Sequence, residues 1–214
     1  WDLLRKHVGR TQSFVTRFTC EEFNRIIDGM SKESLKDLRT AYRDINNERD
    51  TLKKIRRQEF LAMRRIPQAI ALERNTWFHV GANCNQQYMY CLRRMLDPIK
   101  EHVDNNFQPM PKKYLDEFES VRRRINEMMK HTDQMISTNR YDLYRETLII
   151  SDECKDELSA LRERHLNFMQ KDQDAAANMK TSLLYLNILQ ESQEMISIMR
   201  HQLRAAYKFI SEDK

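Results

Sequence analysis

Apolar residues recur every three or four positions along most of this chain, which is the period of one face of an α-helix. Residues 1–18 show the pattern at once, and long stretches with the same period follow up to residue 210. No segment alternates apolar and polar residues as a strand would. The first stripe consists of Leu4, Val8, Thr11, Val15 and Phe18.

The breaks in this pattern predict where helices begin and end. Thr19 followed by Glu22 fits a capping box, so we expect the helix to restart there and to run through Ile27. Gly29 then fits a helix end, and Ser31 fits the cap of the next helix. Further helices are expected over residues 32–66, 69–103, 112–137, 141–170 and 175–210.

Short polar connections make neighbouring helices antiparallel. The sequence therefore predicts an all-α protein, an up-and-down bundle of long antiparallel helices. We divide it into a basic amphipathic N-terminal helical segment, residues 1–29, and a helical bundle, residues 30–214. A weak internal repeat with an offset of 106 residues aligns Asp50–Arg56 with Asp156–Arg162. Two similar halves and a chance likeness between amphipathic helices both explain this repeat.

Composition agrees with a helical chain and limits its function. Gly and Pro, which punctuate turns and sheets, number 3 and 4 in 214 residues. The net charge of +5 comes from interspersed acidic and basic residues, whereas a nucleic-acid surface needs clustered cations, so we expect no nucleic-acid partner. No apolar run approaches the roughly 18 residues of a membrane span. The 4 cysteines are expected to be reduced and buried.

Motifs for catalysis or cofactor binding are missing, so we expect neither an enzyme nor a bound cofactor or metal. Isolated glycines cannot form a phosphate-binding loop, and no two histidines have zinc-ligand spacing. His165 is expected to be a hydrogen-bonded histidine at the edge of the core, with a proton-linked switch as the alternative. Two acidic groups are expected to be solvated helix faces: Asp97, Glu101 and Asp104, and Glu191 and Glu194.

The first helix carries the most suggestive charge pattern. Cations lie opposite its apolar stripe, and only Asp2 opposes them. Such a helix can lie on an anionic membrane surface, and it can equally pack at the periphery of its own bundle. The candidate membrane-proximal face consists of Arg5, Lys6, Arg10 and Arg17.

Three stretches resemble PhoU-like domains, above all those fused behind sodium-phosphate cotransporters and PiT-type inorganic phosphate transporters. They are Thr181–Glu191, Glu101–Phe107 and Leu161–His165. The resemblance implies two similar three-helix units that form a cytoplasmic regulatory domain. Its partner would be a transmembrane phosphate transporter, in the same or another polypeptide, at the cytoplasmic face of the inner membrane. The start at Trp1 suits a soluble domain that follows a transmembrane region.

The resemblance also marks a departure from the family pattern. PhoU proteins bind metal clusters through acids spaced as E/DxxxD, but the matching positions here are Gln193 and Ser197 and, one repeat earlier, Gln87 and Cys91. An amide oxygen is a much weaker ligand for hard cations than a carboxylate, so no metal is assigned to these positions. Gln193 lies within the apolar stripe of its helix, so we expect it to be buried with a polar partner.

Other functions stay open beside regulation of a phosphate transporter. One is a free-standing PhoU-like scaffold that binds a signalling kinase or a separate transporter. Another is an unrelated helical adaptor, and a third is a bundle enzyme that uses the acidic faces. Homodimerisation also stays open. Several apolar spans encoded in frame ahead of Trp1 would favour the fused domain, and a start codon close to it would favour the scaffold.

Overall fold

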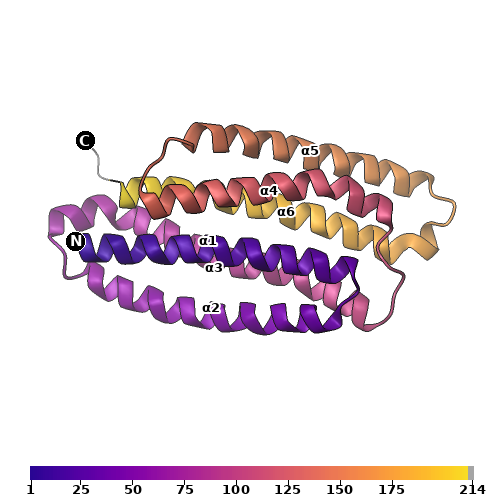
Figure 1. The fold of residues 1–214 in the computed structure, drawn as a ribbon, viewed down its shortest axis with the longest axis horizontal. Coiled ribbons are helices and arrows are strands. Elements are labelled where there is room, and N and C mark those ends of the chain that lie inside the picture. Colours follow the sequence, from indigo (N-terminus) through magenta and orange to yellow (C-terminus); the bar gives the residue numbers. More distant parts are fainter. Residues whose placement is uncertain (212–214) are drawn as a thin grey trace.

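The computed structural model describes residues 1–211, and within them the chain forms six helices. Successive helices run antiparallel along one common axis (Figure 1). The predicted all-α up-and-down bundle is therefore confirmed. The helices are α1 (Asp2–Ser31), α2 (Leu35–Met63), α3 (Gln68–Asp104), α4 (Lys112–Thr138), α5 (Tyr144–Lys171) and α6 (Ala175–Ile210).

The helices are arranged as two three-helix units that share a central layer. Helices α1, α3, α4 and α6 form the centre, where α1 packs on α4 and α3 packs on α6. Helix α2 covers α1 and α3, and α5 covers α4 and α6 on the opposite side (Figure 1). A shift of 106 residues carries α2 and α3 onto 141–169 and 174–210, close to the bounds of α5 and α6. The internal repeat seen in the sequence thus matches the repeat of the helices.

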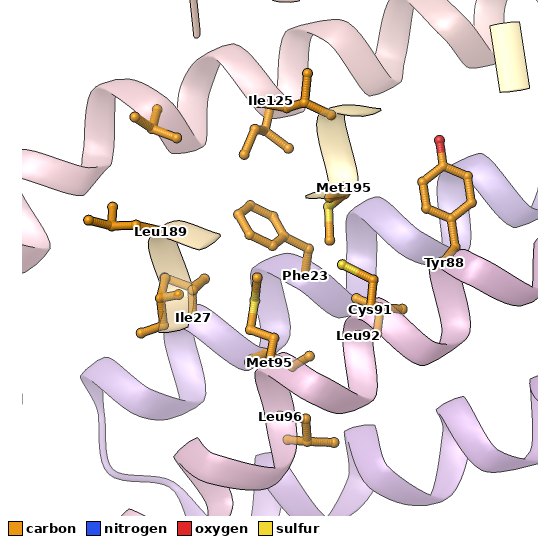
Figure 2. Close-up of a cluster of buried hydrophobic side chains, with 14 of the residues drawn as sticks. Phe23, Ile27, Tyr88, Cys91, Leu92, Met95, Leu96, Ile125, Leu189 and Met195 are labelled. Carbon is orange, nitrogen blue, oxygen red and sulfur yellow. The ribbon is translucent and has the colours of Figure 1, made fainter. Parts of the chain in front are cut away.

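The core lies between the four central helices. Figure 2 shows Phe23 of α1 among side chains from α3, α4 and α6, including Met95, Ile125 and Leu189. Many methionines are fully buried, as expected for flexible side chains that fill irregular gaps. Cys84, Cys91 and Cys154 are buried and Cys20 is half-buried, all as free thiols. Burial raises the pKa of each of these thiols, to about 12 for Cys84 and Cys154.

Helix α1 lacks the breaks that the sequence predicted. It runs unbroken from Asp2 to Ser31, so the expected restart at Thr19 and the expected end at Gly29 are wrong. The apolar stripe continues through the capping-box motif with Phe23, Ile26, Ile27 and Met30, and burial of that stripe outweighs a local capping signal. The proposed boundary between residues 29 and 30 therefore falls inside a helix that packs against α2, α3, α4 and α6.

The turn between α1 and α2 shows the role of Gly29 and identifies the N-cap of α2. A Cβ atom at Gly29 would lie 2.9 Å from Cδ2 of Leu38, so this glycine allows α1 and α2 to approach closely at their turn. The cap of α2 is Ser34 rather than the predicted Ser31, because the Ser34 hydroxyl accepts a hydrogen bond from the backbone N–H of Asp37 at 3.2 Å.

A buried polar network connects three of the central helices. The Tyr88 hydroxyl on α3 donates to Oε1 of Gln202 on α6 at 2.7 Å. The Gln202 amide nitrogen donates to the Thr16 hydroxyl at 2.8 Å and to Oε1 of Gln12 at 3.0 Å, both on α1. All four residues are buried. Each of these four side chains therefore has a hydrogen-bond partner on another helix, which the apolar stripes alone would not require.

We predict that Gln202→Leu lowers the free energy of unfolding by about 1–3 kcal/mol, because the Tyr88 hydroxyl loses its acceptor inside the core. The double variant Gln202→Leu/Tyr88→Phe should recover part of that loss, since both polar partners are then absent. Urea unfolding measures both values, and Gln190→Leu on the exposed face of α6 is the matched control. Equal stability of Gln202→Leu and Gln190→Leu would contradict the network's role.

A second buried polar group on α1, the carboxyl group of Glu22, makes the stability of the bundle depend on pH. The Glu22 side chain is almost fully buried, and its Oε1 lies 3.1 Å from Nη1 of Arg25, which also contacts Asp44 of α2. Burial raises the pKa of Glu22 to about 7, and Arg25 opposes this shift while Asp44 and Glu21 add to it. The folded state thus holds this proton more tightly than the unfolded chain does.

The contribution of Glu22 to stability is therefore expected to fall as pH rises from about 4.5 to about 7, the window between the ordinary and the raised pKa of Glu22. Glu22→Gln removes the ionisation, so its stability should match the parent near pH 4.5 and exceed it above pH 7. Above pH 7, the free energy of unfolding of Glu22→Gln should exceed that of the parent by about 3 kcal/mol at most, which is the energy equivalent of the pKa shift. Urea titrations at both pH values measure the difference, and a difference that does not change with pH would contradict the assignment.

Candidate functional site

A groove of about 770 Å³ runs between the N-terminal half of α1 and the C-terminal end of α4, and the end of α6 closes it. The α1 side supplies charged side chains, the α4 side supplies polar ones, and apolar residues form the floor. The lining residues are Arg5, Lys6, Gly9, Arg10, Ser13, Phe14, Arg17, Asp133, Ile136, Ser137, Thr138, Asn139 and Ile210.

All four cations of the predicted basic face line this groove, but they are not equivalent. Lys6, Arg10 and Arg17 are exposed, and the side chain of Arg17 keeps 58% of its surface accessible. The Arg5 side chain is only 12% exposed, and its Nη2 lies 3.5 Å from Oδ1 of Asp2. Arg5 is therefore largely covered, and the other three cations face solvent.

Helix α1 is at once part of the core and part of the groove. Its stripe of Leu4, Val8 and Val15 is buried within the bundle, as the alternative of a helix packed on its own bundle required. The opposite face carries the three exposed cations together with two exposed apolar side chains, Leu3 and Phe14, which are 83% and 45% accessible. The core thus fixes α1 and orients this mixed face outward.

The opposite wall of the groove is rich in hydrogen-bond acceptors. The hydroxyls of Ser137 and Thr138 donate to the backbone carbonyl of Gln134 at 3.2 and 2.7 Å, so their protons are used and their oxygens can still accept hydrogen bonds. A helix C-terminus also carries partial negative charge. The last turn of α4, all within the described residues, has no basic side chain, but the backbone N–H groups of Asn139 and Arg140 cap the carbonyls of Ile136 and Met135 at 3.3 and 3.1 Å.

Asp133 joins the two walls. Its Oδ1 accepts a hydrogen bond from the Ser13 hydroxyl of α1, and its Oδ2 lies 3.7 Å from Nε of Arg17. The Asp133 side chain is 22% exposed, so one edge of the carboxylate remains accessible from the groove. Sequence reasoning missed Asp133, because 120 residues separate it from Ser13 and no local pattern connects them.

Gln87, Cys91, Gln193 and Ser197 match the metal-binding motif of PhoU proteins without its acids, and we call them the degenerate metal-motif positions. The fold does not bring these four residues together as one site. Gln87 is exposed beside a small pocket between α2 and α3, whereas Cys91 is buried, with its Sγ 3.3 Å from the Glu191 carbonyl oxygen. Ser197 is half-buried, and its hydroxyl accepts a hydrogen bond from the Lys155 ammonium at 2.7 Å. Gln193 is half-buried as well, so its predicted burial is wrong, because it lies at the edge of the α6 stripe.

One of the acidic residues expected to be solvated is buried instead. Glu191 is only 6% exposed, and both of its carboxylate oxygens accept from Nε of Arg94 at 3.1 Å. The contact joins α6 to α3, so this acid holds helices together. Glu194 is exposed, as are the three acids of the other predicted face, Asp97, Glu101 and Asp104.

His165 has the bland role that its stripe position indicated. It is buried between Tyr114 and Tyr185, and its Nε2 lies 3.2 Å from the Ser182 carbonyl oxygen, which fits an N–H donor. Burial lowers the pKa of His165, with Lys113 in the same direction, while the Ser182 carbonyl and Glu117 oppose the shift. The neutral form is therefore favoured at physiological pH, as expected for a hydrogen-bonded histidine at the edge of the core.

Residues 1–211 contain no group of three or more His, Cys, Asp or Glu side chains placed to hold a metal ion. Over the same residues, no helix combines the length and the apolar character needed to cross a membrane. Comparison of the chain with known protein families, curated proteins and solved structures gives no match.

We predict that Ser197→Asp is tolerated without metal, because the new carboxylate would lie beside the Lys155 ammonium, which already bonds to position 197. The melting temperature should match or exceed that of the parent, and added Mn²⁺ should change it little. The double variant Lys155→Met/Ser197→Asp is the control, which should melt lower and respond more to Mn²⁺. A destabilised single variant that Mn²⁺ rescues would show that position 197 belongs to a latent metal site.

Proposed function

We propose that this chain is a non-catalytic regulatory and interaction domain of an inorganic phosphate transporter, held against the cytoplasmic face of the inner membrane by α1. The observation that carries the membrane contact is the mixed face of α1, where exposed Lys6, Arg10 and Arg17 alternate with exposed Leu3 and Phe14. Cations attract anionic headgroups, and apolar side chains gain from contact with the acyl boundary.

The transporter part of the proposal rests on the sequence resemblance of three stretches to PhoU-like domains, and these stretches lie near one another in the fold. The Lys180 ammonium, adjacent to Thr181–Glu191, lies 3.3 Å from the centre of the Phe107 ring, at the end of Glu101–Phe107. His165, at the end of Leu161–His165, bonds to Ser182 of the first stretch. Stretches far apart in the sequence therefore meet at one end of the bundle.

The surface contact should be weak and electrostatic. Each cation near an anionic membrane contributes about 1 kcal/mol, and salt screens this attraction. Three exposed cations therefore suit a domain that the transporter keeps at the membrane, in the same polypeptide or as a bound partner. Regulation would then require only that the bundle alters its contacts with the transporter, without chemistry of its own.

We predict that the purified chain cosediments with vesicles rich in phosphatidylglycerol at low salt and that about 0.5 M NaCl abolishes the binding. Reversal of all three cations, Lys6, Arg10 and Arg17, to Glu should do the same. The matched control reverses three exposed cations of α2 to Glu: Lys53, Lys54 and Arg57. Binding that resists salt, or that the two triple variants lose equally, would contradict a specific role for α1.

The regulatory role has its own test. Cells that encode this chain should change their rate of labelled-phosphate uptake when its coding segment is deleted, and the α1 triple variant should restore the rate less well than the α2 control. Unchanged uptake after deletion, with the transporter still present in the membrane, would contradict the transporter assignment. That result would leave the vesicle measurement as evidence for a membrane-bound scaffold of another kind.

A further inference from the structure

We infer that the groove between α1 and α4 binds the headgroup of a phospholipid that carries a primary ammonium, of the phosphatidylethanolamine type. This inference rests on the proposed function, because the membrane supplies the lipid. The phosphate would lie against the cations of α1, and the ammonium would lie against the end of α4. The part of an acyl chain nearest the glycerol would cover the apolar floor.

The charge of the two walls defines this ligand. On the α1 side, Lys6 and Arg10 are exposed and can both reach an anion. On the α4 side, the Asp133 carboxylate and the hydroxyl oxygens of Ser137 and Thr138 present acceptors at a helix C-terminus. A single ligand that satisfies both walls must carry negative charge at one end and hydrogen-bond donors at the other.

Asp133 has room for an additional donor. A carboxylate offers about four lone-pair positions, and the Ser13 hydroxyl uses one while Arg17 approaches from 3.7 Å. A primary ammonium carries three N–H donors, enough for Asp133 and for neighbouring hydroxyl oxygens. A trimethylated ammonium has the same charge but no N–H donor, so a choline headgroup would leave these acceptors without hydrogen bonds.

The floor and the size of the groove add an apolar requirement. Ile136 and Ile210 are buried and form the floor, Phe14 lies exposed at the edge on the α1 side, and Gly9 adds no side chain to the α1 wall. A volume of about 770 Å³ falls within the range of small-ligand sites and suits a headgroup with part of a glycerol and acyl chain. An acidic peptide would satisfy the cations but would bring its carboxylates toward Asp133, so the lipid is the better occupant.

The test compares vesicles with a fixed fraction of phosphatidylglycerol and a variable second lipid, at a salt concentration of about 0.15 M. The second lipid is phosphatidylethanolamine, its N-monomethyl derivative or phosphatidylcholine. We expect binding about fivefold tighter with ethanolamine than with choline lipids, which is the upper range for one partly exposed ion pair. The monomethyl lipid, which keeps two N–H donors, should behave like the ethanolamine lipid.

The matched variant is Asp133→Asn, whose amide oxygen can still accept from Ser13. It should lose the preference for ethanolamine lipid while retaining salt-sensitive binding to phosphatidylglycerol. Circular dichroism confirms its fold, and if it does not fold, the lipid series with the parent chain decides. Glycerophosphoethanolamine, the soluble headgroup, tests the free ligand: competition by it would support the headgroup site, and stronger binding to it than to vesicles would exclude a membrane source.

Equal binding to ethanolamine and choline vesicles, or a preference that Asp133→Asn preserves, would overturn the inference. Neither result touches the proposed membrane contact, which depends only on salt-sensitive binding to phosphatidylglycerol through α1. The converse result is a chain that binds no anionic vesicle but is saturated by glycerophosphoethanolamine. This result would contradict the membrane contact and support the groove as a site for the soluble headgroup. Displacement from vesicles by an acidic amphipathic peptide but not by glycerophosphoethanolamine would assign the groove to a protein partner instead.

Discussion

Gln202 fixes how the central helices lie against one another. Apolar stripes recur every three or four residues, so two such helices can slide past each other by one turn and still bury similar surfaces. The hydrogen bonds that Gln202 makes to Tyr88 and Thr16 are satisfied in one register only. Gln12, a further partner, directly precedes Ser13 of the groove, and Ile210, which lines the groove, lies two turns beyond Gln202. The shape of the groove therefore depends on this network.

The two three-helix units share a fold but not a surface. Position 59 of α2 and its equivalent 165 of α5 are both buried and polar, yet Glu59 bonds to His7 and Thr11 of α1, whereas His165 bonds to a carbonyl of α6. The cations at positions 6, 10 and 17 correspond to Lys112, Asp116 and Arg123 at the other end of the bundle. An acid thus replaces the central cation there. The repeat explains the bundle, and the differences between its halves explain why the basic groove lies at one end.

Periodicity predicted the helices well because burial of a long stripe dominates helix formation in a bundle. It failed at Thr19 and Gly29, where short local signals competed with a stripe that continues through Met30. The basic face was predictable because its cations share one helix. The acceptor wall was not, because Asp133 reaches Ser13 only after four helices have folded. Glu191 and Gln193 show a similar limit: a difference of two positions on one helix decided which side chain is buried, and periodicity does not resolve the edge of a stripe.

The surroundings of the degenerate metal-motif positions show how the bundle packs without the carboxylate pairs of the motif. Two acids on neighbouring turns of one helix repel each other and need a cation between them. Here the Lys155 ammonium bonds to Ser197, and Arg94 balances the charge of Glu191 beside Cys91. Side-chain cations of the chain itself thus supply this positive charge and connect α5 to α6 and α3 to α6. Because these contacts join helices of one chain, the packing of the third helix in each unit depends on the chain's own residues, and the exposed charge of α1 remains available for partners.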